Sequence, residues 1–280
     1  MISGLLQYEF LQNAFFTGLI IGVIAPLLGV FVVVRRQSLI ADALSHVTLA
    51  GIAFSLFIEK KFLSGVGSIN PLYMGMTFSV IGSLFIERLR GVYKHYQELA
   101  IPIILSSGIG ISVIFISLAD GFNTDLFSYL FGSVSAVSRT DLWTIIGVAV
   151  IVIAIITLLY KEFFLLSFDE DHAKASGIPA HIIHFIFIIL VALVIASSMR
   201  IVGIMLVSSL MTLPVAASMR LANGFKQMIA YSIIFGEISV VSGLVLSYYL
   251  DLAPGGTIVM IAIIILLAAI GYKKIKVRRG

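Results

Sequence analysis

The sequence contains no cysteine and few charged residues, and these two absences exclude several classes of protein. Without cysteine, the chain forms no disulfide and offers no thiolate to a metal ion. Charged residues make up 11% of the sequence and hydrophobic residues 60%. A soluble domain carries about 25% charged residues, so this composition excludes an ordinary soluble protein. We expect one all-α, polytopic transmembrane domain that spans residues 1–280.

Several signatures of catalysis and processing are also missing. The sequence has no G-x-x-x-x-G-K-[ST] loop to hold nucleotide phosphates, no H-E-x-x-H zinc-protease helix and no G-x-S-x-G nucleophile turn. A membrane-embedded enzyme is therefore disfavoured, and any ATP hydrolysis should take place in another chain. The N-terminus has neither a basic region nor a small-residue cleavage site, so we expect no cleaved signal peptide. The net charge of +4 predicts no nucleic-acid partner, because the basic residues lie in short loops between apolar runs.

The apolar runs predict nine membrane-spanning helices, each of about 20 residues. The seventh is the least secure, because Pro214 and the polar run SSLMT interrupt it, and eight spans are the alternative. The expected spans are Asn13–Val34, Ser38–Ile58, Pro71–Ile86, Leu99–Leu118, Leu142–Tyr160, His181–Ser198, Val202–Ala217, Met228–Leu250 and Thr257–Tyr272.

The distribution of basic residues predicts the orientation in the membrane. With nine spans and the N-terminus outside, 14 of the 18 lysines and arginines fall in inner loops and 4 in outer loops. This bias predicts a cytoplasmic C-terminus. The segment Asp120–Asp141 is then a long outer loop, and its apolar centre LFSYLFGSV predicts a short helix that dips towards the membrane.

The inner loop Lys161–Pro179 carries the signals of a second short helix. Either Ser167 or Asp169 could cap its first turn, acidic residues follow, and Gly177 ends it before Pro179. From the residues alone, this segment is either a solvated connector or a docking helix for a cytoplasmic partner.

Two polar residues within the second expected span point to a functional site. Asp42 and His46 are four residues apart, so their side chains lie on one helical face. A carboxylate at membrane depth costs about 2.5–3.5 kcal/mol, and a carboxylate–imidazole pair suggests a divalent metal ion. A structural ion pair or a polar contact between helices is the alternative. Glu237, in the eighth expected span, either lines a pathway or makes such a contact.

Four stretches of the chain resemble the membrane permease of bacterial zinc- and manganese-type ABC importers. They are SLIADALSHV, LFGSVSAVS, SFDEDHAKASGIP and GIMLVSSLMTLPVAAS. The resemblance implies a homodimer in the lipid of the bacterial cell membrane, a pair of cytoplasmic ABC ATPase subunits and an extracellular metal-binding protein. It also implies that Asp42 and His46 form the metal site in the pathway. It places the contact with the ATPases in the inner loop, at Ser167, Phe168, Asp169, Glu170, Asp171, Ala173 and Gly177.

The expected cargo is Zn²⁺, with Mn²⁺ as the alternative, and no resident cofactor is expected. Two copies facing each other would supply two carboxylates and two imidazoles, a set of four ligands that suits tetrahedral zinc. The divalent affinity order places manganese lowest. The wording SHVTLAG is closer to the zinc-type branch than SHAVLPG, which is typical of the manganese-type branch. Aspartate accepts manganese equally well, however, and selectivity could reside in the delivery protein. A secondary metal transporter without an ATPase is the less favoured alternative.

Overall fold

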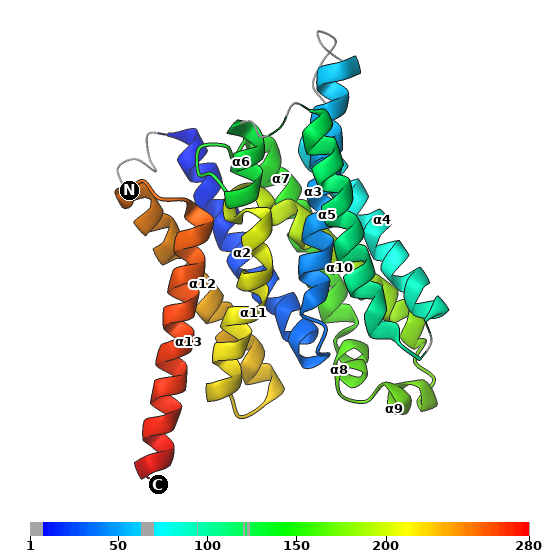
Figure 1. Cartoon of the computed structure of the whole chain (residues 1–280). Helices are drawn as coiled ribbons and strands as arrows, with labels where there is room; N and C mark the ends of the chain where they lie inside the picture. Colours follow the sequence, from blue (N-terminus) through cyan, green and yellow to red (C-terminus); the bar gives the residue numbers. More distant parts are fainter. Residues whose placement is uncertain (1–7, 63–69, 94, 120, 122–123, 280) are drawn as a thin grey trace.

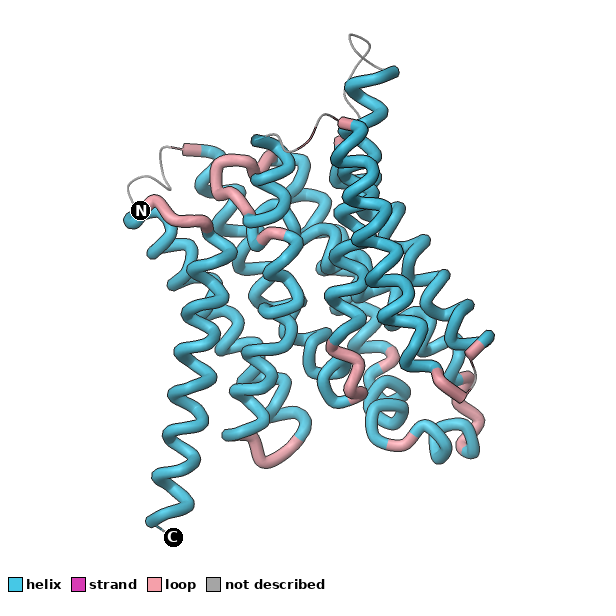
Figure 2. Tube along the Cα trace, in the orientation of Figure 1, coloured by secondary structure: helices cyan, strands magenta, loops and turns pink. Residues whose placement is uncertain are grey.

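A computed structural model describes residues 8–62, 70–93, 95–119, 121 and 124–279 of the chain. These residues form helices joined by short loops and contain no strand (Figure 2). Asp120 and residues 122–123 of the expected outer loop lie outside the described residues. The all-α fold predicted from composition is therefore confirmed.

The described helices follow one another closely along the chain. They are α2 (Glu9–Val34), α3 (Leu39–Phe62), α4 (Pro71–Val92), the 3₁₀ turn η1 (Gln97–Leu99), α5 (Ala100–Leu118), α6 (Thr124–Phe131), α7 (Arg139–Leu158), α8 (Tyr160–Phe168), α9 (Glu170–Ala175), α10 (Ala180–Val202), α11 (Ile204–Leu221), α12 (Phe225–Leu250) and α13 (Pro254–Arg279).

Eight helical segments of the described chain are long and apolar enough to cross a membrane. The seventh expected span corresponds to α11, whose apolar part is the shorter segment Leu206–Leu221. The hydroxyl groups of its SSLMT run reduce its apolar character, and Pro214 lies inside it. By length and composition α11 falls short of the other eight segments, but it connects α10 at the α6 end to α12 at the opposite end of the bundle (Figure 1), as the nine expected spans require.

The two ends of the bundle carry different short helices. Helix α6 lies at the end where α2 begins, whereas α8, α9 and the C-terminal end of α13 lie at the opposite end (Figure 1). The two expected loop helices are thus at opposite ends, as the nine-span topology requires. Which end faces the cytoplasm stays a prediction.

The inner loop contains two short helices where one was expected. Helix α8 precedes the polar segment because Phe163 is buried in the main core and contacts Phe31 and Phe187, each at 5.8 Å between ring centroids. Asp169 then begins α9, since its Oδ1 accepts a hydrogen bond of 2.8 Å from the His172 amide. The apolar side of α8 therefore anchors the polar helix α9 to the bundle.

The junction between α10 and α11 packs backbone against backbone on the end of α6. Gly132 and Gly203 have φ angles of 81° and 85°, in the left-handed region that favours glycine. A Cβ at Gly203 would lie 2.5 Å from the Leu130 carbonyl oxygen, so a larger residue does not fit there. The Ser133 amide donates a hydrogen bond of 2.9 Å to the Arg200 carbonyl oxygen. The outer loop is thereby fixed to the start of α11.

Candidate functional site

Asp42 and His46 lie on α3 as the sequence predicted, one turn apart and both half-buried. Helix α3 is held on its other side by α5, where the Ser112 hydroxyl donates a hydrogen bond of 3.0 Å to the His46 carbonyl oxygen. Gly108 of α5 allows this approach, since a Cβ there would lie 3.0 Å from the Val47 amide nitrogen. The backbone that carries the pair is thus supported from behind.

The Asp42 side chain lines a cavity of about 510 Å³ between α3 and α11. Ser208, Ser209 and Thr212 of α11 line the same cavity, and Ser38 lies at its α3 side. The Thr212 hydroxyl donates to the Ser208 carbonyl oxygen at 3.0 Å, which leaves its oxygen able to accept a hydrogen bond or contact a cation. A carboxylate and several hydroxyl oxygens therefore line one open cavity between apolar helices.

The α11 hydroxyls were not predicted to be site residues. In the sequence, the run SSLMT served only as evidence against the seventh expected membrane span. Its signal was present, because Ser208 and Thr212 are four residues apart on an otherwise apolar helix and therefore share a face. That face could not be assigned to Asp42 without knowing that α3 and α11 are neighbours.

The described residues contain no group of three or more His, Cys, Asp or Glu side chains able to hold a metal ion. One copy of the chain therefore brings the Asp42 carboxylate together with hydroxyl oxygens only, and His46, one turn further along α3, is not among the residues that line the cavity. A complete set of strong ligands would require a second copy or another chain.

Glu237 lies apart from this cavity, on α12 against α2. Its side chain is half-buried, and a Cβ at Gly22 would lie 2.8 Å from Glu237 Oε1. Glu237 is not among the residues that line the Asp42 cavity. Glu237 Oε1 is buried without a hydrogen-bond partner among the described residues, so neither of the two interpretations left open by the sequence gains a polar contact from the structure.

Helix α9 presents its acidic residues to the surface. Asp169, Glu170 and Asp171 are exposed, whereas Ala173 is fully buried and docks the helix. The cap is Asp169, not Ser167, whose hydroxyl donates to the Phe163 carbonyl oxygen at 2.6 Å.

Two further features complete the α9 segment. Lys174 forms an ion pair of 2.8 Å with Glu170 and lowers the pKa of that carboxyl group through this hydrogen bond. Gly177 follows the helix, as the sequence predicted, and has a φ angle of 81°. Phe168, the last residue of α8, is 60% exposed.

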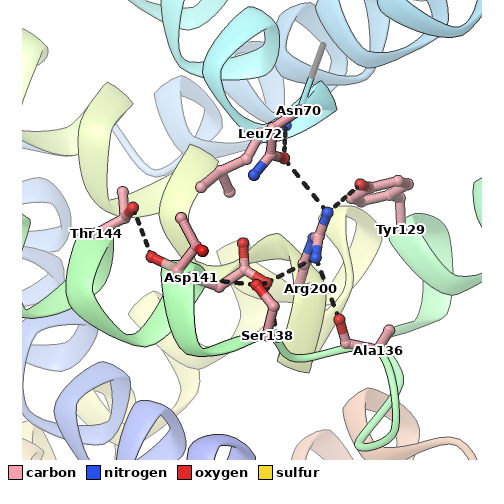
Figure 3. A network of polar contacts seen from close by, with 9 residues as sticks. Asn70, Leu72, Tyr129, Ala136, Ser138, Asp141, Thr144 and Arg200 are labelled. Carbon is pink, nitrogen blue, oxygen red and sulfur yellow. Dashed lines mark hydrogen bonds and ion pairs between the residues drawn. The ribbon is translucent and has the colours of Figure 1, made fainter. Parts of the chain in front are cut away.

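A buried ion pair at the opposite end was not predicted (Figure 3). Arg200 Nη1 donates to Asp141 Oδ2 at 2.6 Å and to the Ala136 carbonyl oxygen at 3.2 Å. Its Nη2 donates to the Tyr129 hydroxyl at 2.8 Å and to Asn70 Oδ1 at 3.3 Å. One guanidinium group therefore joins α6, the α6–α7 loop, α7 and the start of α4 to α10.

Known proteins resemble this chain over almost all of its length. The model of the ABC 3 transport family matches residues 7–273. A probable metal transport system membrane protein of Treponema pallidum is 34% identical, and the match covers 97% of this chain and 98% of that protein. The manganese transport system membrane protein MntC of Listeria monocytogenes is 35% identical, with 96% of this chain and 92% of that protein covered.

Solved structures give the same result. A chain of PsaBC from Streptococcus pneumoniae, solved in complex with a Fab, superposes with a TM-score of 0.81 at 33% identity, over 96% of this chain and 93% of that one. The extent of these matches, and their agreement with the helical order described above, identify the chain as a member of the ABC 3 transport family.

Proposed function

We propose that this chain is the membrane-spanning permease of an ATP-driven importer of divalent metal ions, with Mn²⁺ as its main cargo. Family membership makes it a multi-pass ABC transporter permease of the cell membrane. The observation that carries the cargo is the Asp42 cavity, a carboxylate-bearing polar space within the bundle. The Treponema relative is a probable metal transport protein, and the Listeria relative is a manganese transport protein, which supports manganese over the zinc expected from the sequence.

The chemistry of the cavity also supports manganese. Carboxylate, hydroxyl and water oxygens suit Mn²⁺, whereas sites rich in imidazole and thiolate favour zinc. Asp42, Ser38, Ser209 and Thr212 contribute oxygen atoms to the cavity, whereas His46 lies one turn away on α3, outside its lining, and would supply one imidazole per copy. With a second copy, the site would hold two carboxylates, two imidazoles and additional hydroxyl oxygens. The expectation of tetrahedral zinc counted only the carboxylates and imidazoles.

Protonation of the imidazole is linked to capture of the ion. A metal binds the neutral imidazole, so His46 must release any proton it carries when the ion arrives. Asp42 holds negative charge beside the ion and offsets the charge of the cation in the low dielectric of the bundle. The hydroxyl oxygens of α11 supply weaker contacts, which favours release as well as binding.

The proposed assembly contains a second copy of the chain, a pair of cytoplasmic ATPase subunits and an extracellular metal-binding protein. ATP hydrolysis belongs to the ATPase subunits, and the chain itself is a transport subunit. The exposed acidic face of α9 is the proposed contact with the ATPases, because it is anchored to the core through α8 and Ala173. Motion of an ATPase would thereby reach the transmembrane helices.

The proposed orientation places α8, α9 and the C-terminus in the cytoplasm, at one end of the bundle (Figure 1). The basic residues of the C-terminal segment KKIKVRR support it. A reporter enzyme that is active only outside the cell, fused after Arg279, should be silent. A strong external signal would reverse the orientation.

Cellular metal content tests the proposed cargo. A strain that lacks the gene should lose manganese and regain it when the gene is restored, while zinc stays level. A fall in zinc with level manganese would return the assignment to zinc. Uptake that persists when the ATPase gene is deleted would favour a secondary transporter instead.

A further inference from the structure

A cavity of about 690 Å³ lies at the α8–α9 end of the bundle. It is separate from the Asp42 cavity and shares no lining residue with it. The last turn of α2, the last turns of α4 and the first turn of α10 form its walls, and α8 and α9 close it from the side. Its charged lining residues are Arg35, Arg36, Glu87, Arg90, Glu170 and Lys174.

Both carboxylates of this cavity already have partners. Glu170 forms its ion pair of 2.8 Å with Lys174. Glu87 lies with one oxygen 3.3 Å from His181 Nε2 and with the other 3.5 Å from His184 Nε2. The lining therefore holds four cationic side chains, Arg35, Arg36, Arg90 and Lys174, against two carboxylates, and its formal charge is positive.

Among the described residues, the three arginines form no ion pair of their own, although Glu170 and Glu87 offset part of the charge of Arg35 from a longer distance. Within the described part of the chain, no carboxylate forms an ion pair with Arg35, Arg36 or Arg90. Arg35 donates to His184 Nδ1 at 3.1 Å, and burial lowers its pKa to about 10, so it stays charged at neutral pH. Arg90 Nη2 donates to Gln97 Oε1 at 3.1 Å, while its Nη1 is buried without a hydrogen-bond partner.

This charge distribution selects the sign of a ligand. Three guanidinium groups repel a cation, which argues against a metal site at Glu87, His181 and His184 although these groups lie close together. They attract an anion, and the planar guanidinium fork matches the oxygen atoms of a phosphate group. A buried, unpartnered Nη1 of Arg90 leaves one strong donor available for such a ligand.

We propose that this cavity binds the phosphate group of an anionic phospholipid at the α8–α9 end of the bundle. Its arginines lie where α2 and α4 end, which is the level of the lipid headgroups for helices of this length. The volume is that of a small-molecule site and exceeds the space that a single carboxylate side chain needs.

A lipid-binding measurement on the full-length protein tests this proposal without reference to metal transport. The purified, delipidated protein is titrated with phosphatidylglycerol or phosphatidylethanolamine and analysed by native mass spectrometry. The double variant Arg36→Gln/Arg90→Gln should bind phosphatidylglycerol ~25-fold more weakly, at about fivefold per arginine. The matched control is Arg88→Gln/Arg220→Gln, which removes the same charge from two exposed arginines outside the cavity. It should retain the affinity of the unchanged protein.

Parallel titrations with inorganic phosphate and ATP identify the source of the phosphate group. Binding of either one, lost in Arg36→Gln/Arg90→Gln and kept in the control, would support the phosphate site and assign it to a soluble ligand. Equal binding of phosphatidylglycerol by both double variants, with no binding of phosphate or ATP, would overturn the proposal. If Arg36→Gln/Arg90→Gln bound anions normally but no longer assembled with the ATPase, the proposal would also be overturned. The arginines would then be assigned to the contact with that protein partner.

Discussion

Replacing Arg200 with alanine should destabilise the protein far more than breaking a surface ion pair of similar length. The guanidinium group bonds to Asp141, Ala136, Tyr129 and Asn70, and the Asp141 side chain is 5% exposed. Without Arg200 the carboxylate stays buried, loses its only ion-pair partner among the described residues and keeps the hydrogen bonds from the Ser138 amide and hydroxyl. Breaking a buried pair in this way costs about 3–5 kcal/mol.

The matched control is Lys174→Ala on α9. Its ion pair with Glu170 is 2.8 Å long, close to the 2.6 Å of Arg200–Asp141, but both side chains are 55% exposed. Solvent screens such a pair, and its loss costs about 0–1 kcal/mol. Because the two ion pairs have similar lengths, a difference in lost stability between the two variants reports the effect of burial.

Denaturant titration of the purified protein in detergent provides the measurement. Trp143, the only tryptophan of the chain, lies two residues from Asp141 on α7 and reports this end of the bundle by fluorescence. Circular dichroism reports the helices as a whole. Equal losses of stability for Arg200→Ala and Lys174→Ala would refute the assignment of a buried network at this end.

Two further predictions concern packing and coupling. Gly29→Ala should lower the free energy of unfolding by about 1–3 kcal/mol, because the new Cβ would overlap the Met211 carbonyl oxygen of α11. The control is Gly91→Ala, whose new Cβ would meet nothing within 4 Å. Equal stability of the two variants in the same titration would contradict the close approach of α2 and α11. Replacing Asp169, Glu170 and Asp171 with Asn, Gln and Asn keeps an N-cap and removes three negative charges. Co-purification with the ATPase should weaken, or hydrolysis should continue without uptake, and unchanged assembly and uptake would make α9 a solvated connector.

Features that depend on neighbouring residues in the chain could be predicted from the sequence. Apolar runs of sufficient length located the membrane-spanning helices to within a few residues at most ends. The four-residue spacing placed Asp42 and His46 on one face, and an acidic first turn with Gly177 located α9. Each of these signals acts within one or a few helical turns.

Features that depend on distant residues could not be predicted. Arg200 and Asp141 are 59 residues apart. From the sequence, Arg200 was only one of the basic residues assigned to the outer loops. The hydroxyls of α11 reach Asp42 only because α3 and α11 pack together. The expected seventh span was uncertain for the same reason, since its polar residues face a cavity and not lipid.

Uptake of radioactive manganese by cells that express Asp42→Ala or His46→Ala tests the central claim most directly. The matched control is Ser107→Ala, an exposed hydroxyl of α5 that bonds only to the Ile103 carbonyl oxygen in the described structure. Each site variant should insert and dimerise normally but take up no more manganese than cells without the gene, whereas the control should transport at the normal rate. Normal uptake by either site variant would contradict the claim that the ion passes that residue on α3.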